Sequence, residues 1–143
     1  MIIGYTTGVF DLFHIGHLRM LSTARTLCNH LIVGVTVDEL VQYKHKKSVI
    51  PFDERLAVVS ALKCVDTAVP QYSLDKYEAW KKIKYNVLFV GDDWYNAGDW
   101  PELELKLSKH NVKVTYLPYT RSTSSTLINE TLLNLRRAPN DSP

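Results

Sequence analysis

The sequence predicts an α/β fold with a doubly wound parallel sheet, and three observations point to it. Short apolar runs recur along the chain, stretches with helical spacing of apolar residues separate them, and strand and helix alternate from end to end. Consecutive strands joined through a helix must be parallel, with helices on both faces of the sheet. The length of 143 residues is that of one domain.

Five apolar runs are short enough, and sufficiently bounded by turn residues, to be buried strands. The expected strands are 2–7, 30–36, 66–70, 87–91 and 112–117. Apolar residues with helical spacing fall in 18–27, 56–65, 77–83, 103–107 and 127–135. We find no repeat and no linker, so we expect a catalytic domain over 1–137 and a flexible tail over 138–143, which holds two prolines.

Composition excludes several classes of function. The net charge of +2 and the scattered lysines and arginines disfavour a nucleic-acid-binding surface. No apolar stretch reaches the roughly 18 residues of a membrane span, and no signal peptide is recognisable. Two cysteines, Cys28 and Cys64, lie in apolar helical patterns, which favours a reduced pair over a disulfide. We therefore expect a cytoplasmic protein.

The loop after the first strand, Gly8–His17, carries the most informative pattern. Gly8 is expected to let the chain turn off the strand, and Gly16 to let a ligand approach the start of the next helix. His14 and His17, three apart, would share one side of the first turn. Two imidazoles beside a helix N-terminus are suited to hydrogen-bonding a phosphoryl group in a transition state.

The histidine pair could instead bind a metal or serve only the fold. The spacing would suit half of a zinc site, but no cysteine or third histidine is near in sequence. A purely structural pair, which caps or packs the helix, is the usual role of such a motif. The glycines and Asp11 at a strand-to-helix junction favour a functional site.

These residues resemble a known family. Gly-Val-Phe-Asp-Leu-Phe-His-Ile-Gly-His, residues 8–17, is similar to the signature of the cytidylyltransferases, which belong to the HxGH nucleotidyltransferase superfamily with a Rossmann-like fold. Adenylyltransferases of the same superfamily share this motif. The resemblance therefore implies nucleotidyl transfer, and it implies that Gly8, Val9, Phe10, His14 and His17 bind the nucleotide.

The loop that opens the last predicted helix resembles the second cytidylyltransferase signature. A turn rich in Ser and Thr can be a simple helix cap, but its hydroxyls and free N–H groups can also hold phosphate. Thr120, Ser124, Ser125 and Thr126 match the signature. Tyr119 stands where the family usually has arginine. Either Arg121 reaches the nucleotide phosphates from its shifted position, or Tyr119 marks a subfamily that binds them in another way, and the resemblance places both residues at the nucleotide.

The basic run 44–47 follows the second strand and so should share the histidines' edge of the sheet. A basic run is often only a solvated surface, but lysine is also a point charge for phosphate. The resemblance implies that Lys46 contacts the nucleotide and acts in catalysis. It also implies an acceptor-phosphate site that includes Lys44, Arg55, Asp66 and Lys76.

Gly91-Asp92-Asp93-Trp94 follows the fourth predicted strand. Adjacent carboxylates can cap a helix, or can bind a hydroxyl, an amino group or a metal. The four residues resemble the form typical of glycerol-3-phosphate cytidylyltransferases, which implies that Asp93 contacts the nucleotide.

The implied reaction transfers CMP from CTP to an alcohol phosphate, with glycerol 3-phosphate first and choline, ethanolamine, ribitol or another polyol phosphate as alternatives. CDP-glycerol and pyrophosphate would be the products. Magnesium is expected with the nucleotide, Asp11 is the candidate for contact with it, and a homodimer is implied by the resemblance alone. An adenylyltransferase and a non-catalytic nucleotide-binding module remain the rival interpretations.

Overall fold

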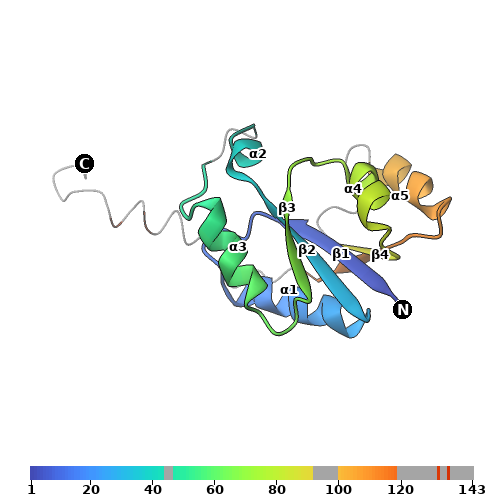
Figure 1. Ribbon diagram of the computed structural model, residues 1–143, viewed down its shortest axis with the longest axis horizontal. Helices are drawn as coiled ribbons and strands as arrows, with labels where there is room; N and C mark the ends of the chain where they lie inside the picture. Colours follow the sequence, from blue (N-terminus) through green and yellow to red (C-terminus); the bar gives the residue numbers. More distant parts are fainter. Residues whose placement is uncertain (44–46, 92–99, 119–131, 133–134, 136–143) are drawn as a thin grey trace.

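The computed structural model describes residues 1–43, 47–91, 100–118, 132 and 135 of the chain. Five parallel strands form one sheet in the order β3-β2-β1-β4-β5 (Figure 1). The strands are β1 (Ile3–Gly8), β2 (His30–Thr36), β3 (Thr67–Gln71), β4 (Val87–Gly91) and β5 (Lys113–Leu117). The helices are α1 (Ile15–Thr26), α2 (Asp38–Tyr43), α3 (Phe52–Ser60), α4 (Lys76–Ile83) and α5 (Trp100–Ser108). The α/β prediction and the parallel sheet are confirmed.

The sheet is wound in two directions from its centre. The chain runs outward from β1 to β2 and β3, then crosses back to β4, which pairs with β1 on the other side. The strand order therefore reverses between β1 and β4. Ligands of open α/β sheets bind outside the carboxyl ends of the strands at such a reversal point.

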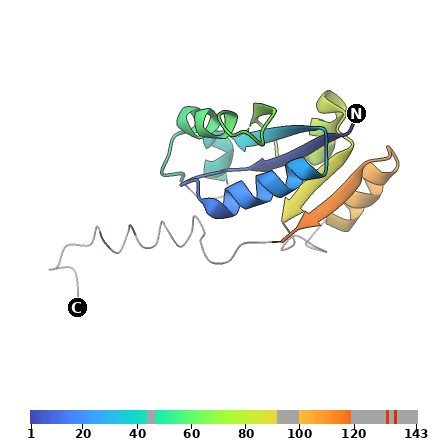
Figure 2. The same ribbon diagram turned by 90° about the horizontal axis from the view of Figure 1, so that it is seen from below.

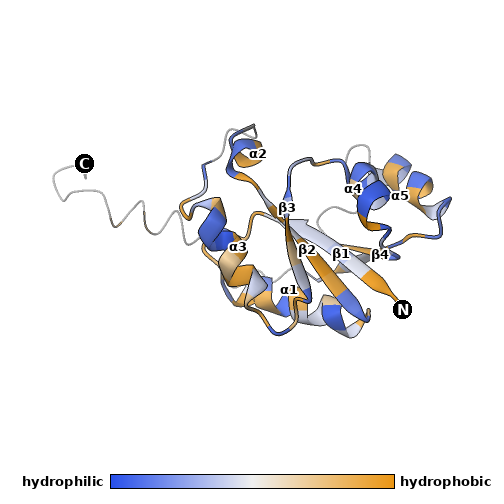
Figure 3. Ribbon diagram, in the orientation of Figure 1, coloured by the Kyte–Doolittle hydropathy of each residue, from blue (hydrophilic) through white to orange (hydrophobic). Residues whose placement is uncertain are grey.

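Two hydrophobic clusters cover the two faces of the sheet. One packs Leu21 and Ala24 of α1 and Val59 of α3 on Leu31 and Val33 of β2. The other packs α4 and α5 on the opposite face through Tyr5, Tyr85, Leu88 and Leu107, with the rings of Tyr5 and Tyr85 stacked at 5.0 Å between centroids. Figure 2 shows α5 lying against β5, and Figure 3 shows hydrophobic residues along β2 and hydrophilic residues on α4.

Two details differ from the sequence-based expectations. The helix α2 was not predicted, and it separates β2 from the basic run. The helix α3 ends at Ser60 although the apolar pattern continues to Val65, because residues 61–65 make short turn hydrogen bonds and carry their apolar side chains back to the core. The predicted last helix and tail lie almost entirely outside the described residues.

Both cysteines are free, as expected, with Cys28 buried and Cys64 half-buried. In the part of the chain that the structure describes, no helix is both long and apolar enough to cross a bilayer.

Candidate active site

The loop between β1 and α1 is shaped by an aromatic side chain and by two strained residues. Phe10 and Leu12 have φ of 54° and 50°, which is uncommon for residues other than glycine. The Phe10 ring is buried under Gly8, where an added Cβ would lie 2.9 Å from it. Gly8 is therefore required for close packing, and the turn that we assigned to its flexibility is made by Phe10 and Leu12. Such strain is typical of functional loops.

His14 and His17 form a reciprocal cap at the start of α1. His14 is the N-cap residue, and its Nδ1 accepts a hydrogen bond of 3.0 Å from the Gly16 N–H. His17 Nδ1 in turn accepts one of 3.2 Å from the His14 N–H. The two rings stack with centroids 4.0 Å apart. This arrangement has the logic of a capping box, with imidazoles in place of the usual hydroxyl and carboxylate.

The cap determines which ring nitrogen can act on a ligand. A neutral imidazole carries one proton, and both Nδ1 atoms are occupied as acceptors, so we assign the proton of each ring to Nε2. In each ring Nδ1 therefore caps the helix, and Nε2 remains as a hydrogen-bond donor. The pair can offer two N–H groups to one anion beside the helix N-terminus, where positive potential is already present.

Burial keeps these rings neutral. The pKa of His17 is lowered to about 4, chiefly by desolvation and to a lesser extent by the nearby His14, while Asp11 opposes the shift. Desolvation also lowers the pKa of His14. Phe10 and Phe13 pack against His17 with centroids at 5.5 and 5.1 Å, which accounts for its loss of hydration. Both rings are therefore without formal charge near neutral pH, and each can act as a hydrogen-bond donor through Nε2.

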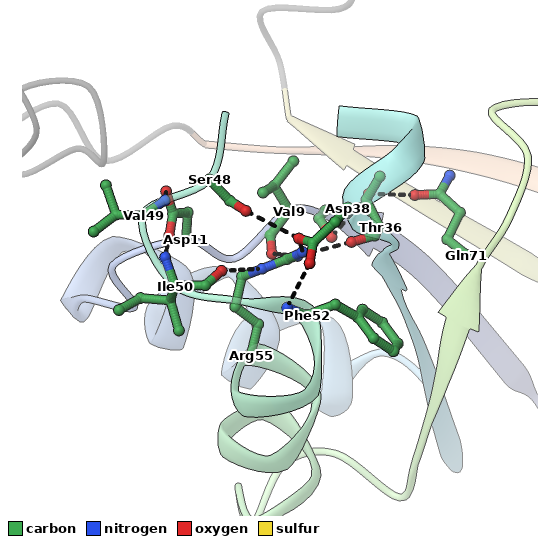
Figure 4. Close-up of polar contacts among 11 residues, drawn as sticks. Val9, Asp11, Thr36, Asp38, Ser48, Val49, Ile50, Phe52, Arg55 and Gln71 are labelled. Carbon is green, nitrogen blue, oxygen red and sulfur yellow. Dashed lines mark hydrogen bonds and ion pairs between the residues drawn. The ribbon is translucent and has the colours of Figure 1, made fainter. Parts of the chain in front are cut away.

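Asp11 ties the histidine loop to the segment before α3 (Figure 4). Its two carboxylate oxygens accept hydrogen bonds of 2.8 and 2.9 Å from the N–H groups of Val49 and Ile50. No cluster of three metal-ligating side chains occurs within the described ranges.

Arg55 was predicted to contact substrate, and the structure corrects this. Its side chain is fully buried, and its guanidinium donates to the carbonyl oxygens of Val9, Thr36 and Ile50 at 2.7–2.9 Å. It also pairs with Asp38 at 2.6 Å. A guanidinium held by three carbonyls and a carboxylate in the interior cannot reach a ligand in this conformation. Its role is to hold the surrounding loops in place.

Asp66 was also assigned to the acceptor site, and the structure places it at the opposite edge of the sheet. It precedes β3, so it lies at the amino ends of the parallel strands. Its carboxylate accepts a hydrogen bond of 2.7 Å from the Leu31 N–H and pairs with Arg25 at 2.8 Å. Asp66 therefore fixes the entry into β2 and β3 and does not belong to the site.

Lys76 lies on the expected side. It is the first residue of α4, which follows β3 and therefore starts at the carboxyl edge, and Asp75 caps that helix by accepting from the Tyr77 and Glu78 N–H groups. The carbonyl of Lys76 accepts a bond of 2.7 Å from the buried Tyr85 hydroxyl. The remaining predicted site residues lie outside the described residues: Lys44, Lys46, Asp93, Tyr119, Thr120, Arg121, Ser124, Ser125 and Thr126.

Three polar residues that shape this edge, Asp38, Thr36 and Gln71, were not among the predicted site residues. Asp38, in the first turn of α2, accepts from the Arg55 guanidinium, the Ser48 hydroxyl and the Phe52 N–H, and its pKa is lowered because these hydrogen bonds outweigh its desolvation. The Thr36 hydroxyl lies within hydrogen-bond distance of Gln71 and of the Gly8 carbonyl, and so joins the ends of β1, β2 and β3. Each of these three residues ends or follows a predicted strand, and that position is the signal by which the sequence could have identified it.

Comparison with known proteins agrees with this geometry. Residues 5–131 match the family described as cytidylyltransferase-like. The glycerol-3-phosphate cytidylyltransferase of Staphylococcus aureus is 33% identical over 128 residues, which is 89% of this chain and 92% of that enzyme. The FAD synthase of Methanothrix thermoacetophila is 41% identical over 101 residues, which is 70% of this chain and 69% of that enzyme.

A solved structure shares the fold as well. The lipopolysaccharide core biosynthesis protein from Thermoplasma volcanium superimposes with a TM-score of 0.71 at 29% identity, covering 86% of this chain and 99% of that one. The family match includes the whole histidine loop and the carboxyl ends of all five strands. A pair of neutral imidazole donors at that edge is consistent with transfer of a nucleotidyl group, and the chain belongs to the cytidylyltransferase-like family of nucleotidyltransferases.

Proposed function

We propose that this protein transfers CMP from CTP to glycerol 3-phosphate, giving CDP-glycerol and pyrophosphate. The observation that carries the proposal is the histidine cap, which presents two Nε2–H donors at the carboxyl edge. The choice of substrates is supported by the match to glycerol-3-phosphate cytidylyltransferases along nine-tenths of their length, and by the resemblance of Gly91–Trp94 to theirs.

In the proposed reaction a phosphate oxygen of glycerol 3-phosphate attacks the α-phosphorus of CTP in line. A P–O bond forms to the acceptor while the bond to the bridging oxygen of the β-phosphate breaks, so pyrophosphate leaves with the bonding electron pair. No protein nucleophile is needed, and catalysis consists of positioning and charge stabilisation. His14 and His17 would hydrogen-bond the α-phosphoryl oxygens as their negative charge shifts toward the leaving group.

The roles of the remaining site residues follow the family resemblance and form part of the proposal. Lys46 and the hydroxyls of Ser124–Thr126 would hold the triphosphate, while Lys44 and Lys76 would hold the acceptor phosphate. Magnesium would arrive with the triphosphate as a companion of the nucleotide, and it would neutralise part of the triphosphate charge. The homodimer is also part of the proposal, and its test is the mass measured by light scattering.

A second candidate rests on the FAD synthases, whose identity to this chain is higher although it covers less of it. FAD is AMP joined to flavin mononucleotide, so the corresponding reaction would transfer AMP from ATP to that acceptor. The same histidine cap would serve it, because in the proposed mechanism the cap would contact phosphate and not the base.

A pyrophosphate-release assay distinguishes these candidates. CTP and ATP are each tested with glycerol 3-phosphate, further alcohol phosphates and flavin mononucleotide. We expect turnover with CTP and glycerol 3-phosphate, and products identified by mass spectrometry. Turnover only with ATP and flavin mononucleotide would establish the second candidate, and turnover with another alcohol phosphate would reassign the acceptor. Nucleotide binding without pyrophosphate release from any pair would contradict both candidates and leave a binding module.

Variants of the cap test its role in the same assay. His14→Ala and His17→Ala should each lower kcat by about 100-fold, as expected for loss of one preorganised donor. His30→Ala is the matched control, because His30 begins β2 at the amino edge, where its ring contacts the Thr67 hydroxyl. Turnover like that of the wild type in either cap variant would contradict the mechanism.

A further inference from the structure

Arg55 is a buried cation whose hydrogen bonds join three separate segments through four acceptors. Val9 belongs to the histidine loop, Thr36 ends β2, Asp38 begins α2 and Ile50 precedes α3, and all four accept from this one guanidinium (Figure 4). Burying a charge costs several kcal/mol unless its polar atoms are paired. A simple apolar side chain could fill the space, so the retention of a guanidinium needs a physical reason.

The geometry of the acceptors offers one. Three of the four acceptors are backbone carbonyls, two of them in loops and one at the end of a strand. The planar fork of arginine supplies donors in several fixed directions, which the single ammonium of lysine cannot reproduce. Arg55 therefore fixes the relative position of loops that secondary structure leaves free.

A second connection reaches the same segment from the histidine loop. Asp11 accepts from the N–H groups of Val49 and Ile50, while Arg55 holds the Ile50 carbonyl and Asp38 holds the Ser48 hydroxyl. Residues 48–50 are thus bound on both sides. They directly follow the basic run 44–47, which carries the lysines proposed to bind phosphate.

We propose that Arg55 and Asp38 are positioning residues that hold the segment after the basic run at a fixed distance from the histidine loop. This inference rests on the proposed function, since the two elements would carry the acceptor phosphate and the nucleotide α-phosphate respectively. Correct alignment of the two is the main contribution that such an enzyme makes, and a misplacement of about 1 Å can cost roughly 100-fold in rate.

Arg55→Lys tests the inference while it retains the positive charge. We expect the KM for the acceptor to rise and kcat to fall by roughly 10- to 100-fold, with the dissociation constant for the nucleotide changed by less than about threefold. The nucleotide constant is measured by calorimetry without acceptor. Asp11→Ala removes the second connection to residues 49 and 50 and leaves the pair of Arg55 and Asp38 intact. It should likewise change kcat and the KM for the acceptor more than the dissociation constant for the nucleotide.

Arg25→Lys is the matched control. Arg25 also pairs with an aspartate, Asp66, but at the amino edge of the sheet. This variant should lose some thermal stability but keep its kcat, its KM for the acceptor and its dissociation constant for the nucleotide. If Arg55→Lys loses only thermal stability and keeps kcat and both constants below its melting temperature, the positioning role is wrong. An equal loss of nucleotide and acceptor binding would also overturn it.

A readout without turnover separates this inference from the proposed function. Hydrogen exchange of the Val49 and Ile50 amides reports the position of the segment even if no substrate pair is turned over. Arg55→Lys should accelerate exchange at both amides, and Arg25→Lys should not. Unchanged protection in Arg55→Lys would overturn the inference, whereas absence of pyrophosphate release by the wild type would overturn the proposed function alone.

Discussion

The two histidines show how one side chain can serve the fold and the reaction through different atoms. Nδ1 of each ring completes the backbone hydrogen bonds at the start of α1, and this fixes the tautomer in which Nε2 is the donor. The packing of Phe10 and Phe13 on His17 then keeps that ring neutral. The strained loop, the aromatic core and the proposed catalytic donor therefore depend on one another.

This arrangement predicts a dependence of stability on pH. The pKa of His17 is lowered from 6.5 to about 4 in the folded protein, so the unfolded chain binds more protons between these values. The free energy of unfolding should therefore fall as the pH decreases from 7 to 4.5. The slope from this ring should stay below the limit of about 1.4 kcal/mol per pH unit for one group, because the ring is only partly buried.

His17→Gln isolates that contribution. Glutamine at this helix position can accept from the N-cap N–H as His17 does, but it does not titrate. Urea denaturation at several pH values should show a flatter decline for the variant than for the wild type, with a residual slope from His14 and further titrating groups. Parallel curves for the two proteins between pH 7 and 4.5 would contradict the assigned burial of His17.

At the scale of elements, α5 is fastened to β5 by a chain of two hydrogen bonds. The Trp100 indole N–H donates to the Tyr116 hydroxyl at 2.7 Å, and that hydroxyl donates to the Glu104 carboxylate at 2.7 Å. Trp100 is the first residue of α5, and Tyr116 is one residue from the end of β5. The bonds thus hold together the ends of two elements that border residues 92–99 and 118–126.

Tyr116→Phe should weaken this connection without opening a cavity. The variant leaves the indole N–H and the carboxylate without their shared partner, which should cost about 1–3 kcal/mol of stability. We expect the loss in urea denaturation, with the slope of the unfolding curve unchanged. Tyr72→Phe is the matched control, because Tyr72 is 74% exposed and its hydroxyl should contribute little. An equal effect of the two substitutions would show that the chain of bonds has no energetic role.

The elements also show what the sequence could and could not predict. The β4 and β2 ranges were predicted to the residue because each is a short apolar run with polar residues close to both ends. The helix α2 was missed because six residues are too few for a visible period. The histidine cap was found from its motif, whereas Asp38 and the buried role of Arg55 depend on contacts between segments up to 46 residues apart, which no local pattern contains.

At the scale of the whole molecule, the polarity of the parallel sheet decides which residues can share a site. All strands run in one direction, so residues that follow strands gather at one edge and residues that precede them at the opposite edge. His14, Asp11, Asp38 and Lys76 follow strands, while Asp66, Asn29 and Asn86 precede them. The amino edge has its own structural contacts: Asn29 and Asn86 accept from the Ile2 and Ile3 N–H groups, as Asp66 does from Leu31.

Asp66→Asn tests this division between the edges. The substitution removes the charge that pairs with Arg25 and weakens the bond to the Leu31 N–H. A partly exposed pair of this kind should contribute about 1–2 kcal/mol, which for a domain of this size is a fall in melting temperature of roughly 3–7 °C. The distance from the histidines is about the length of a strand, roughly 17–20 Å, too far for contact with a shared ligand. The KM for both substrates should therefore remain within about twofold of the wild type when measured well below the melting temperature. A selective rise in the KM for the acceptor would return Asp66 to the site and would mean that the ligand reaches across the sheet.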